Sequence, residues 1–347
     1  MSGHSRKTAV VVCPGRGTYN AAELGYLARY HGSRGDFLEM ADRHRLANGQ
    51  MPITALDSTP EFLSEHTTSE NAATLIFGCS FSDFCAIDRD TYEVTAITGN
   101  SMGWYTALVC GGAISPATGL EIVHTMGALM HERGVGGQIV YPVVGDDWRP
   151  APKGRAEVME LLARLVRNGA NLHVSIDLGG MLVFAGEDSA LDALVEALPK
   201  VGRYPMRLAG HAAFHSPLLS HIAREAQRRL PPGLFTGPSL PLVDGRGVIW
   251  RPFASTPEAL WDYTLDAQVT ETYDFAAAIR VSVREFAPDL LIILGPGETL
   301  GGAVAQSLIA IDWRGLADKN DFSRRQATAP VVLAMSRADQ RSPVTSR

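Results

Sequence analysis

A short strand that runs into the sequence GNSMG at residues 99–103, followed by a helical pattern up to about residue 113, most constrains the fold of this chain. Gly-x-Ser-x-Gly between a strand and a helix is the signature of a nucleophile elbow, a sharp turn that exposes the serine hydroxyl at the mouth of a sheet. The amides that follow lie at a helix N-terminus, where they can stabilise an oxyanion. The alternative is a glycine-rich turn with a capping serine and no chemistry. The flanking strand and helix favour Ser101 as a nucleophile.

Composition excludes several classes of protein. The chain has 347 residues and 46% hydrophobic content, enough for one large core or for a large domain with a smaller one. No apolar stretch approaches the roughly 20 residues needed to span a bilayer, and the N-terminal run at 9–13 is too short for a signal peptide. A net charge of −6 and the lack of a basic stripe with interleaved aromatics argue against nucleic-acid binding. Four cysteines without a CxxC pair are typical of a reduced, cytoplasmic protein.

Two continuous apolar runs, Lys7–Cys13 and Leu290–Leu294, predict strands that are buried on both faces of a parallel sheet. Each run ends in a glycine-rich loop, at 14–18 and at 295–300. The first loop has neither the Gly-Lys-Ser/Thr of a Walker loop nor GxGxxG, so it is a weak candidate for phosphate binding. Free backbone N–H groups in this loop could instead form half of an oxyanion hole that faces the elbow.

Helices are predicted over 60–86, from Ser115-Pro116 to about His131, and over most of 257–286. Ser115 is an expected N-cap, with proline at the first helical position. The helix from residue 116 carries a stripe of methionine and histidine side chains, a pattern more typical of packing than of metal ligation. That stripe comprises His124, Met126, Met130 and His131. About the last dozen residues are expected to be disordered or loosely attached.

Residues 137–208 show a different pattern. Strands are predicted at 138–144, 172–176, 181–185 and 204–208, and helices at 154–168 and 189–198. The order βαββαβ is that of the ferredoxin-like split unit. We therefore expect a discrete subdomain, inserted into the larger domain, that forms one wall of a cleft over Ser101.

His211 and His215 follow this unit, four residues apart. Such spacing can ligate a metal, but the glutamate of a zincin motif is absent and no third ligand is evident. A general base is the better interpretation for one of the two, because their loop lies at a domain junction where a cleft is expected.

Four separated segments carry a family resemblance: CPGRGTYN, ITGNSMGWYTALVCGGAIS, AFHSPLL and ILGPGETLGG. Over roughly residues 7–310 the chain resembles the malonyl-CoA:acyl carrier protein transacylases and the acyltransferase domains of polyketide synthases. The resemblance implies an α/β-hydrolase-like core with a parallel sheet, made of 1–136 and 209–315, and a ferredoxin-like subdomain at 137–208. Residues 316–347 would be a partly flexible C-terminal extension.

The resemblance also implies roles for individual residues. Ser101 would be the nucleophile and His215 the general base. Backbone N–H groups of Met102 and Arg16 would form the oxyanion hole. The family orients its histidine with a main-chain or amide oxygen, and the corresponding stretch aligns around Asp274.

The chain departs from the family pattern at several substrate-binding positions. Asn100 stands where histidine is usual, and Arg16, next to Gly15, replaces a glutamine. On the helix after the elbow, Met126 occupies the position of the arginine that grips the malonyl carboxylate. Arg133 lies two turns further on and would not superpose. Because a buried carboxylate without its cation costs several kcal/mol, either another base substitutes or the acyl group is uncharged.

The leading interpretation is a cytoplasmic ping-pong acyltransferase that uses acyl-CoA and acyl carrier protein, without a metal or a bound cofactor. An acyl hydrolase that clears carrier proteins would differ only in admitting water to the acyl-serine. An ordinary α/β-hydrolase esterase would need an acid, such as Asp177 or Asp188, beside His215, and the chain lacks its HGGG motif. A non-catalytic scaffold for carrier proteins would have no need of an elbow. The acyl chain, the pathway and the oligomeric state stay open.

Overall fold

The main sheet of the protein has six strands in the order β11-β10-β1-β2-β7-β8. The computed structural model describes residues 6–32, 35–151 and 154–345. The strands are β1 (Lys7–Cys13), β2 (Tyr92–Gly99), β7 (Leu242–Val243), β8 (Ile249–Trp250), β10 (Leu290–Ile293) and β11 (Val332–Ala334). From β11 to β7 each neighbouring pair is parallel, and β8 runs antiparallel to β7 at the edge.

The two continuous apolar runs form adjacent central strands, as predicted. In β1, Val11 pairs with Ile97 of β2 on one side and with Ile292 of β10 on the other. All three side chains are fully buried. Burial on both faces explains why these strands read as unbroken apolar runs instead of alternating patterns.

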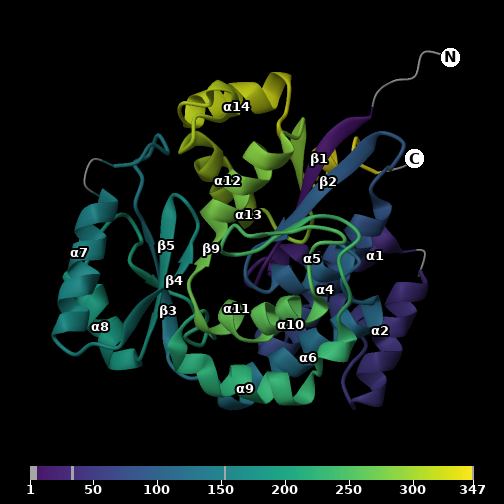
Figure 1. Cartoon of the computed structure of the whole chain (residues 1–347), viewed down its shortest axis with the longest axis horizontal. Coiled ribbons are helices and arrows are strands. Elements are labelled where there is room, and N and C mark those ends of the chain that lie inside the picture. The colour runs from purple at the N-terminus through teal and green to yellow at the C-terminus, as the bar shows by residue number, and fades with distance from the viewer. Residues whose placement is uncertain (1–5, 33–34, 152–153, 346–347) are drawn as a thin grey trace.

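Helices cover both faces of this sheet (Figure 1). The core helices are α1 (Tyr26–His31), α2 (Asp36–Ala47), α3 (Ile53–Asp57), α4 (Ser69–Ala86), α5 (Gly103–Cys110), α6 (Pro116–Arg133), α9 (Ser220–Arg229), α10 (Pro257–Leu265), α11 (Ala267–Thr270), α12 (Phe275–Phe286), α13 (Thr299–Ile309), α14 (Lys319–Thr328) and α15 (Ala338–Arg341). In Figure 1, α12 and α13 lie on one side of β1 and β2, while α4, α5 and α6 lie on the other. The Ser115 cap is confirmed: its hydroxyl oxygen accepts from the Thr118 amide at 3.1 Å.

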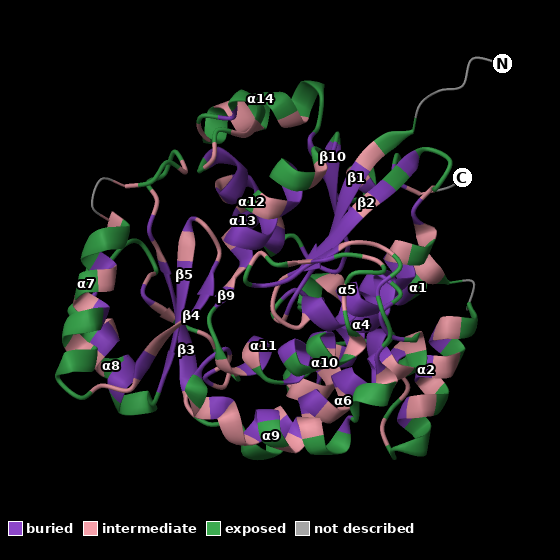
Figure 2. Ribbon diagram, viewed as in Figure 1, coloured by how far each residue is buried: buried purple, intermediate pink, exposed green. Residues whose placement is uncertain are grey.

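The ferredoxin-like unit is present with the predicted element order. Its elements are β3 (Gly137–Pro142), α7 (Gly154–Arg167), β4 (Leu172–Asp177), β5 (Met181–Gly186), α8 (Asp188–Ala197) and β6 (Met206–Arg207). A separate hydrophobic cluster that includes Phe184 and Leu191 lies between the sheet and the two helices. In Figure 2 the strands of this sheet are mostly buried, and α7 and α8, which lie along one side of it, are exposed on their outer faces.

The small sheet extends beyond the inserted segment. Its strand order is β6-β3-β5-β4-β9, and β9 (Tyr273–Asp274) comes from the core half of the chain. Ile176 of β4 pairs in parallel with Tyr273. A strand from the core half of the chain thus completes the small sheet, and it follows closely after α11, which carries part of the site described below.

The expectation of a loosely attached C-terminus is wrong for the described residues up to 345. β11 completes the main sheet, where Leu333 pairs with Ile292. In α15 the buried side chain of Arg341 forms an ion pair with the buried Asp83 at 2.6 Å. Because the tail is rich in charged residues, its sequence did not indicate the short apolar strand β11 or the buried ion pair of Arg341. No helix within the described ranges is both long enough and apolar enough to cross a membrane.

Candidate active site

The elbow has the geometry that its sequence predicts. Strand β2 ends at Gly99 and α5 begins at Gly103, with Ser101 between them at φ 55°. This left-handed conformation is rare and costly for a residue with a side chain, and such strain is concentrated at functional sites. A Cβ at Gly103 would collide with the main-chain oxygen of Cys13. The glycine is therefore required for α5 to pack against the end of β1.

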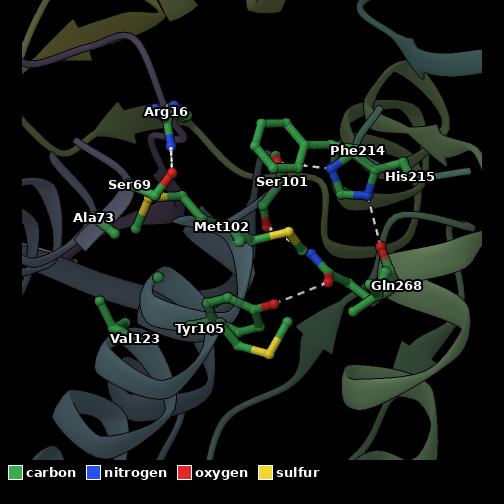
Figure 3. Close-up of a pocket in the computed structure, with 14 residues that line it drawn as sticks. Arg16, Ser69, Ala73, Ser101, Met102, Tyr105, Val123, Phe214, His215 and Gln268 are labelled. Atoms are coloured by element: carbon green, nitrogen blue, oxygen red, sulfur yellow. Dashed lines mark hydrogen bonds between the residues drawn. The ribbon is translucent and has the colours of Figure 1, made fainter. Parts of the chain in front are cut away.

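His215 is the histidine that meets Ser101. Its Nε2 lies 2.7 Å from Ser101 Oγ, and its Nδ1 donates to the main-chain oxygen of Gln268 at 2.6 Å (Figure 3). Because a carbonyl oxygen can only accept, Nδ1 carries the proton, and Nε2 of the neutral ring is free to accept from the serine hydroxyl. Burial lowers the pKa of His215 to about 4, although its hydrogen bond to Gln268 acts in the opposite direction. The imidazole is therefore an unprotonated base at neutral pH.

Gln268 is a site residue that sequence reasoning missed. It lies on the short helix α11 with 3% of its surface exposed. Besides accepting from His215, it donates from Nε2 to the main-chain oxygen of Ser101 at 3.0 Å, and its Oε1 accepts from the Tyr105 hydroxyl at 3.2 Å. A main-chain acceptor has no sequence signature, because every residue carries one.

The expectation that Asp274 orients His215 is corrected by these contacts. The Asp274 carboxylate accepts from the Ala277 amide at 2.7 Å and caps the N-terminus of α12. An aspartate directly before a helix is a preferred cap, so this local role accounts for the residue. Burial raises the pKa of Asp274.

The amides expected to form the oxyanion hole border the same pocket as Ser101. Met102 and Arg16 both line it, and neither of their main-chain N–H groups donates to another residue in the part of the chain that the structure describes. The elbow is tied to β1 by a hydrogen bond from the Asn100 amide to the oxygen of Cys13 at 2.9 Å. Two donors near a nucleophile can stabilise a developing oxyanion.

Gly15 and Asn100, expected on the substrate-binding surface, are packed against each other instead. A Cβ at Gly15 would collide with the main-chain oxygen of Asn100. Neither residue lines the pocket. Close approach of the loop after β1 to the elbow accounts for both positions.

The pocket beside Ser101 is largely apolar. It has an empty volume of about 610 Å³, part of it open to solvent, and is walled by α4, α5 and α6 (Figure 3). Its lining includes Ala73, Tyr105, Val123, Met126 and Met130. Met126 is 3% exposed, and its thioether forms part of the pocket wall.

Arg133 and His211 do not reach Ser101. Arg133 is exposed at the end of α6 and is not part of the pocket lining. His211 Nδ1 donates to Gln138 Oε1 at 2.7 Å and not to Ser101. Burial and the neighbouring Arg16 cation lower the pKa of His211 to about 3.

Comparisons with known proteins point in one direction. No protein-family model matches the chain. It is 27% identical over 216 residues to the malonyl CoA-acyl carrier protein transacylase of Salmonella typhimurium, covering 59% of this chain and 63% of that protein. It is 25% identical over 322 residues to the phenolphthiocerol synthesis polyketide synthase Pks15/1 of Mycobacterium marinum, covering 89% of this chain and 14% of the synthase. The chain spans less than two thirds of the length of each curated relative that it matches.

Solved structures extend the likeness to nearly the whole chain. The malonyl-CoA:ACP transacylase of Synechocystis superposes with a TM-score of 0.73 at 15% identity, covering 97% of this chain and 100% of that one. The acyl-carrier-protein S-malonyltransferase of Burkholderia pseudomallei gives 0.75 at 20% identity, with 97% and 98% covered. A complex of a type II polyketide synthase acyl carrier protein with its malonyl-transacylase gives 0.73 at 20% identity, with 96% and 97% covered. The resemblance read from four sequence motifs is thereby confirmed, and the chain has the fold of the malonyl-CoA:acyl carrier protein transacylases.

Proposed function

We propose that the protein transfers an acyl group from coenzyme A to the phosphopantetheine thiol of an acyl carrier protein, through an acyl-serine at Ser101. The observation that carries this proposal is the hydrogen-bonded series from Ser101 to His215 to the main-chain oxygen of Gln268, at the edge of an apolar pocket. A nucleophile, a base and a group that orients the base are the parts that acyl transfer requires. The Salmonella relative and the solved neighbours carry the names of transacylases, which supports the same reaction.

The first half-reaction acylates the enzyme. Ser101 Oγ attacks the thioester carbonyl carbon while its proton passes to Nε2 of His215. The negative charge on the former carbonyl oxygen faces the amides of Met102 and Arg16. Collapse of the tetrahedral intermediate breaks the carbon–sulfur bond, and His215 returns the proton to the departing coenzyme A sulfur.

The second half-reaction is the reverse with a different thiol. The phosphopantetheine thiol of the carrier protein gives its proton to His215 and attacks the acyl-serine carbonyl. Release of Ser101, which regains the proton, leaves the acyl group on the carrier protein. The acyl-CoA thioester and the carrier-protein thiol are both substrates, so the proposed reaction needs no resident cofactor or metal.

The acyl group is proposed to be uncharged, although malonyl is the donor named for the relatives. Met126 and its apolar neighbours cannot offset the desolvation of a carboxylate in this pocket. Acetyl or longer uncharged chains would instead gain from burial against Val123 and Met126. The described residues that line the pocket include one cation, Arg16, whose side chain is considered below.

The esterase alternative loses support from the positions of its candidate acids. Asp177 pairs with Arg155 at 2.5 Å, and Asp188 pairs with Arg207 at 3.0 Å. The base receives its orienting contact from a carbonyl oxygen instead. A hydrolase would retain every residue of the proposed mechanism, so the product must distinguish it from a transferase.

The proposed setting is the cytoplasm, which suits the four cysteines, all of them free thiols. The proposed macromolecular partner is an acyl carrier protein; one structural neighbour is a transacylase complex with such a carrier. No role with nucleic acid or membrane is part of the proposal.

Intact-mass spectrometry tests the proposal. The protein is exposed to acetyl-, butyryl-, hexanoyl- and malonyl-CoA, and the mass gain of one acyl group is measured in the unmodified chain and in Ser101→Ala. We expect acylation of the first and none of the second, with unchanged circular dichroism. Adding carrier protein should then move the acyl group onto its thiol. Release as free acid would favour the hydrolase, and labelling of Ser101→Ala would exclude Ser101 as nucleophile.

A further inference from the structure

Arg16 connects three segments that are far apart in the sequence. Its Nη1 donates to Ser69 Oγ at 2.8 Å, and its Nη2 donates to the main-chain oxygens of Thr67 at 3.0 Å and Gly210 at 2.9 Å. Arg16 itself lies in the loop after β1. Thr67 ends the short 3-10 turn before α4, Ser69 is the first residue of α4, and Gly210 precedes the loop that carries His215. The guanidinium also lies 5.7 Å from the centre of the Phe214 ring.

Among the residues that the structure describes, the Arg16 guanidinium is held by neutral acceptors and not by a carboxylate. No carboxylate in the described residues lies within ion-pair distance of its guanidinium, and all three acceptors are neutral oxygens. Burial lowers the pKa of the Arg16 side chain. An unpaired cation beside a pocket raises the question of whether it awaits the carboxylate of a substrate.

The hydrogen-bond pattern argues against that role. An arginine grips a carboxylate through two parallel N–H groups, either Nη1 with Nη2 or Nε with Nη2. Nη2 belongs to both pairs, and its two hydrogens are already directed to Thr67 and Gly210. Binding a carboxylate bidentately would break at least one of these contacts.

We infer that the Arg16 side chain is a clasp that positions the catalytic apparatus, an inference that rests on the proposed function. The main-chain amide of Arg16 is an expected oxyanion donor, and its side chain is anchored to Gly210, five residues before the base His215. Arg16 thereby links the loop after β1, which carries the expected oxyanion donor, to the loop that carries His215. Its hydrogen bond to Ser69 also fixes the guanidinium to the start of α4. Arg16 acts through these neighbours, so it is a positioning residue.

If Arg16 is such a clasp, its substitution should lower the acylation rate without changing the preference between acyl donors. Arg16→Gln retains the main-chain amide, but the shorter glutamine side chain cannot reach all three acceptors. The distance between this amide and His215 is then no longer fixed by the side chain. Misplacement of reacting groups by about 1 Å can cost on the order of 100-fold in rate. We expect kcat for acylation by acetyl-CoA to fall by about 10-fold or more, with little change in KM and with the acetyl-to-malonyl preference unchanged. Arg16→Lys should recover part of the rate, because an ammonium has three donors but lacks the planar fork.

Arg133→Gln is the matched control, because it removes the same charge from an exposed site outside the pocket. Hydrogen–deuterium exchange is measured on the same proteins. Faster exchange at 66–69 and 209–213 is expected in Arg16→Gln and not in Arg133→Gln. Unchanged kcat with unchanged exchange would overturn the clasp. A loss confined to malonyl-CoA, with the acetyl-CoA rate intact, would overturn it in favour of carboxylate binding. If the unmodified protein is acylated by no donor, the proposed function fails, and exchange alone decides the clasp.

Discussion

Gln268 donates a hydrogen bond from its side-chain Nε2 to the main-chain oxygen of Ser101 at 3.0 Å, while its own main-chain oxygen accepts from His215. The proposed nucleophile and the proposed base are therefore held by two different parts of one residue. Both of them have left-handed backbones, with φ of 55° at Ser101 and 54° at His215. Strained conformations of this kind persist only where surrounding contacts over-determine them, and Gln268 provides two such contacts.

Gln268→Met should separate these two functions of Gln268. The variant keeps the main-chain oxygen for His215 and a similar side-chain volume. It removes one of the two donors to the main-chain oxygen of Ser101, which then accepts only from the Trp104 amide, and it removes the acceptor of the Tyr105 hydroxyl. A buried polar group left without a partner, here the Tyr105 hydroxyl, costs about 1–3 kcal/mol, so the free energy of unfolding should fall by at least that amount in urea titration. The acylation rate should fall as well, because the elbow is less firmly held.

Tyr105→Phe is the matched control for Gln268→Met. It removes only the hydroxyl that donates to Oε1 of Gln268 and leaves the Ser101 contact in place. The unpaired Oε1 of Gln268 should lower stability, but we expect a smaller total loss of stability and of rate than in Gln268→Met, because the hydrogen bond to Ser101 is kept. An equal loss in the two variants would show that the side-chain donor to Ser101 has no separate role.

His215 and His211 can be distinguished by substitution. His215→Ala removes the base at 2.7 Å from Ser101 Oγ, and general-base contributions are typically about 10²–10⁴-fold. The acylation rate, followed by intact mass over time, should fall within that range. His211→Ala removes a side chain that contacts Gln138 and should have a much smaller effect. A larger effect of His211→Ala would show that His215 is not the base.

The pH dependence of acylation should reflect the buried state of the base. His215 must be unprotonated to accept the serine proton, and burial lowers its pKa to about 4. Protonation, and with it the loss of rate, should therefore begin well below the ordinary histidine range. We expect kcat/KM for acylation to be constant from pH 8 down to about pH 5 and to fall near pH 4. An acidic limb centred near the ordinary value of about 6.5 would contradict the neutral, desolvated base.

Sequence patterns predicted those parts of the molecule that depend on local chemistry. The elbow at Ser101, the cap at Ser115 and the two buried runs around Val11 and Ile292 each follow from residue types at short spacing. The ferredoxin-like unit was predicted from the order of its elements. His215 was selected through the resemblance of its segment, since four-residue spacing alone did not distinguish it from His211.

Long-range contacts account for what the sequence did not predict. Gln268 reaches Ser101 across 167 positions, and Arg16 reaches Gly210 across 194. Arg341 pairs with Asp83 across 258, which converts an apparently loose tail into part of the core. In each case the partner is a generic backbone group or a charged residue among many others. Asp274 shows the converse: an acid suited to orienting a histidine is used by its own helix as a cap.

The choice of acyl donor is tested at Met126. In a pocket walled by Val123, Met126 and Met130, a carboxylate would lose its hydration and gain no fork of donors in return. We therefore expect acetyl-CoA to acylate Ser101 at least as well as malonyl-CoA when the two compete and intact mass reports the product. Met126→Arg should move the preference toward malonyl by about 1.5–3 kcal/mol, the range for a hydrogen bond to a charged group.

Met126→Leu controls for the change in shape at this position, because it alters the side chain without adding charge. Its acetyl-to-malonyl preference should match that of the unmodified protein. A strong preference of the unmodified protein for malonyl-CoA would contradict the inference from Met126. Arg16→Gln then identifies the responsible cation: if malonyl preference disappears in that variant while acetyl transfer continues, the guanidinium gives up its contacts with Thr67 or Gly210 to bind the substrate.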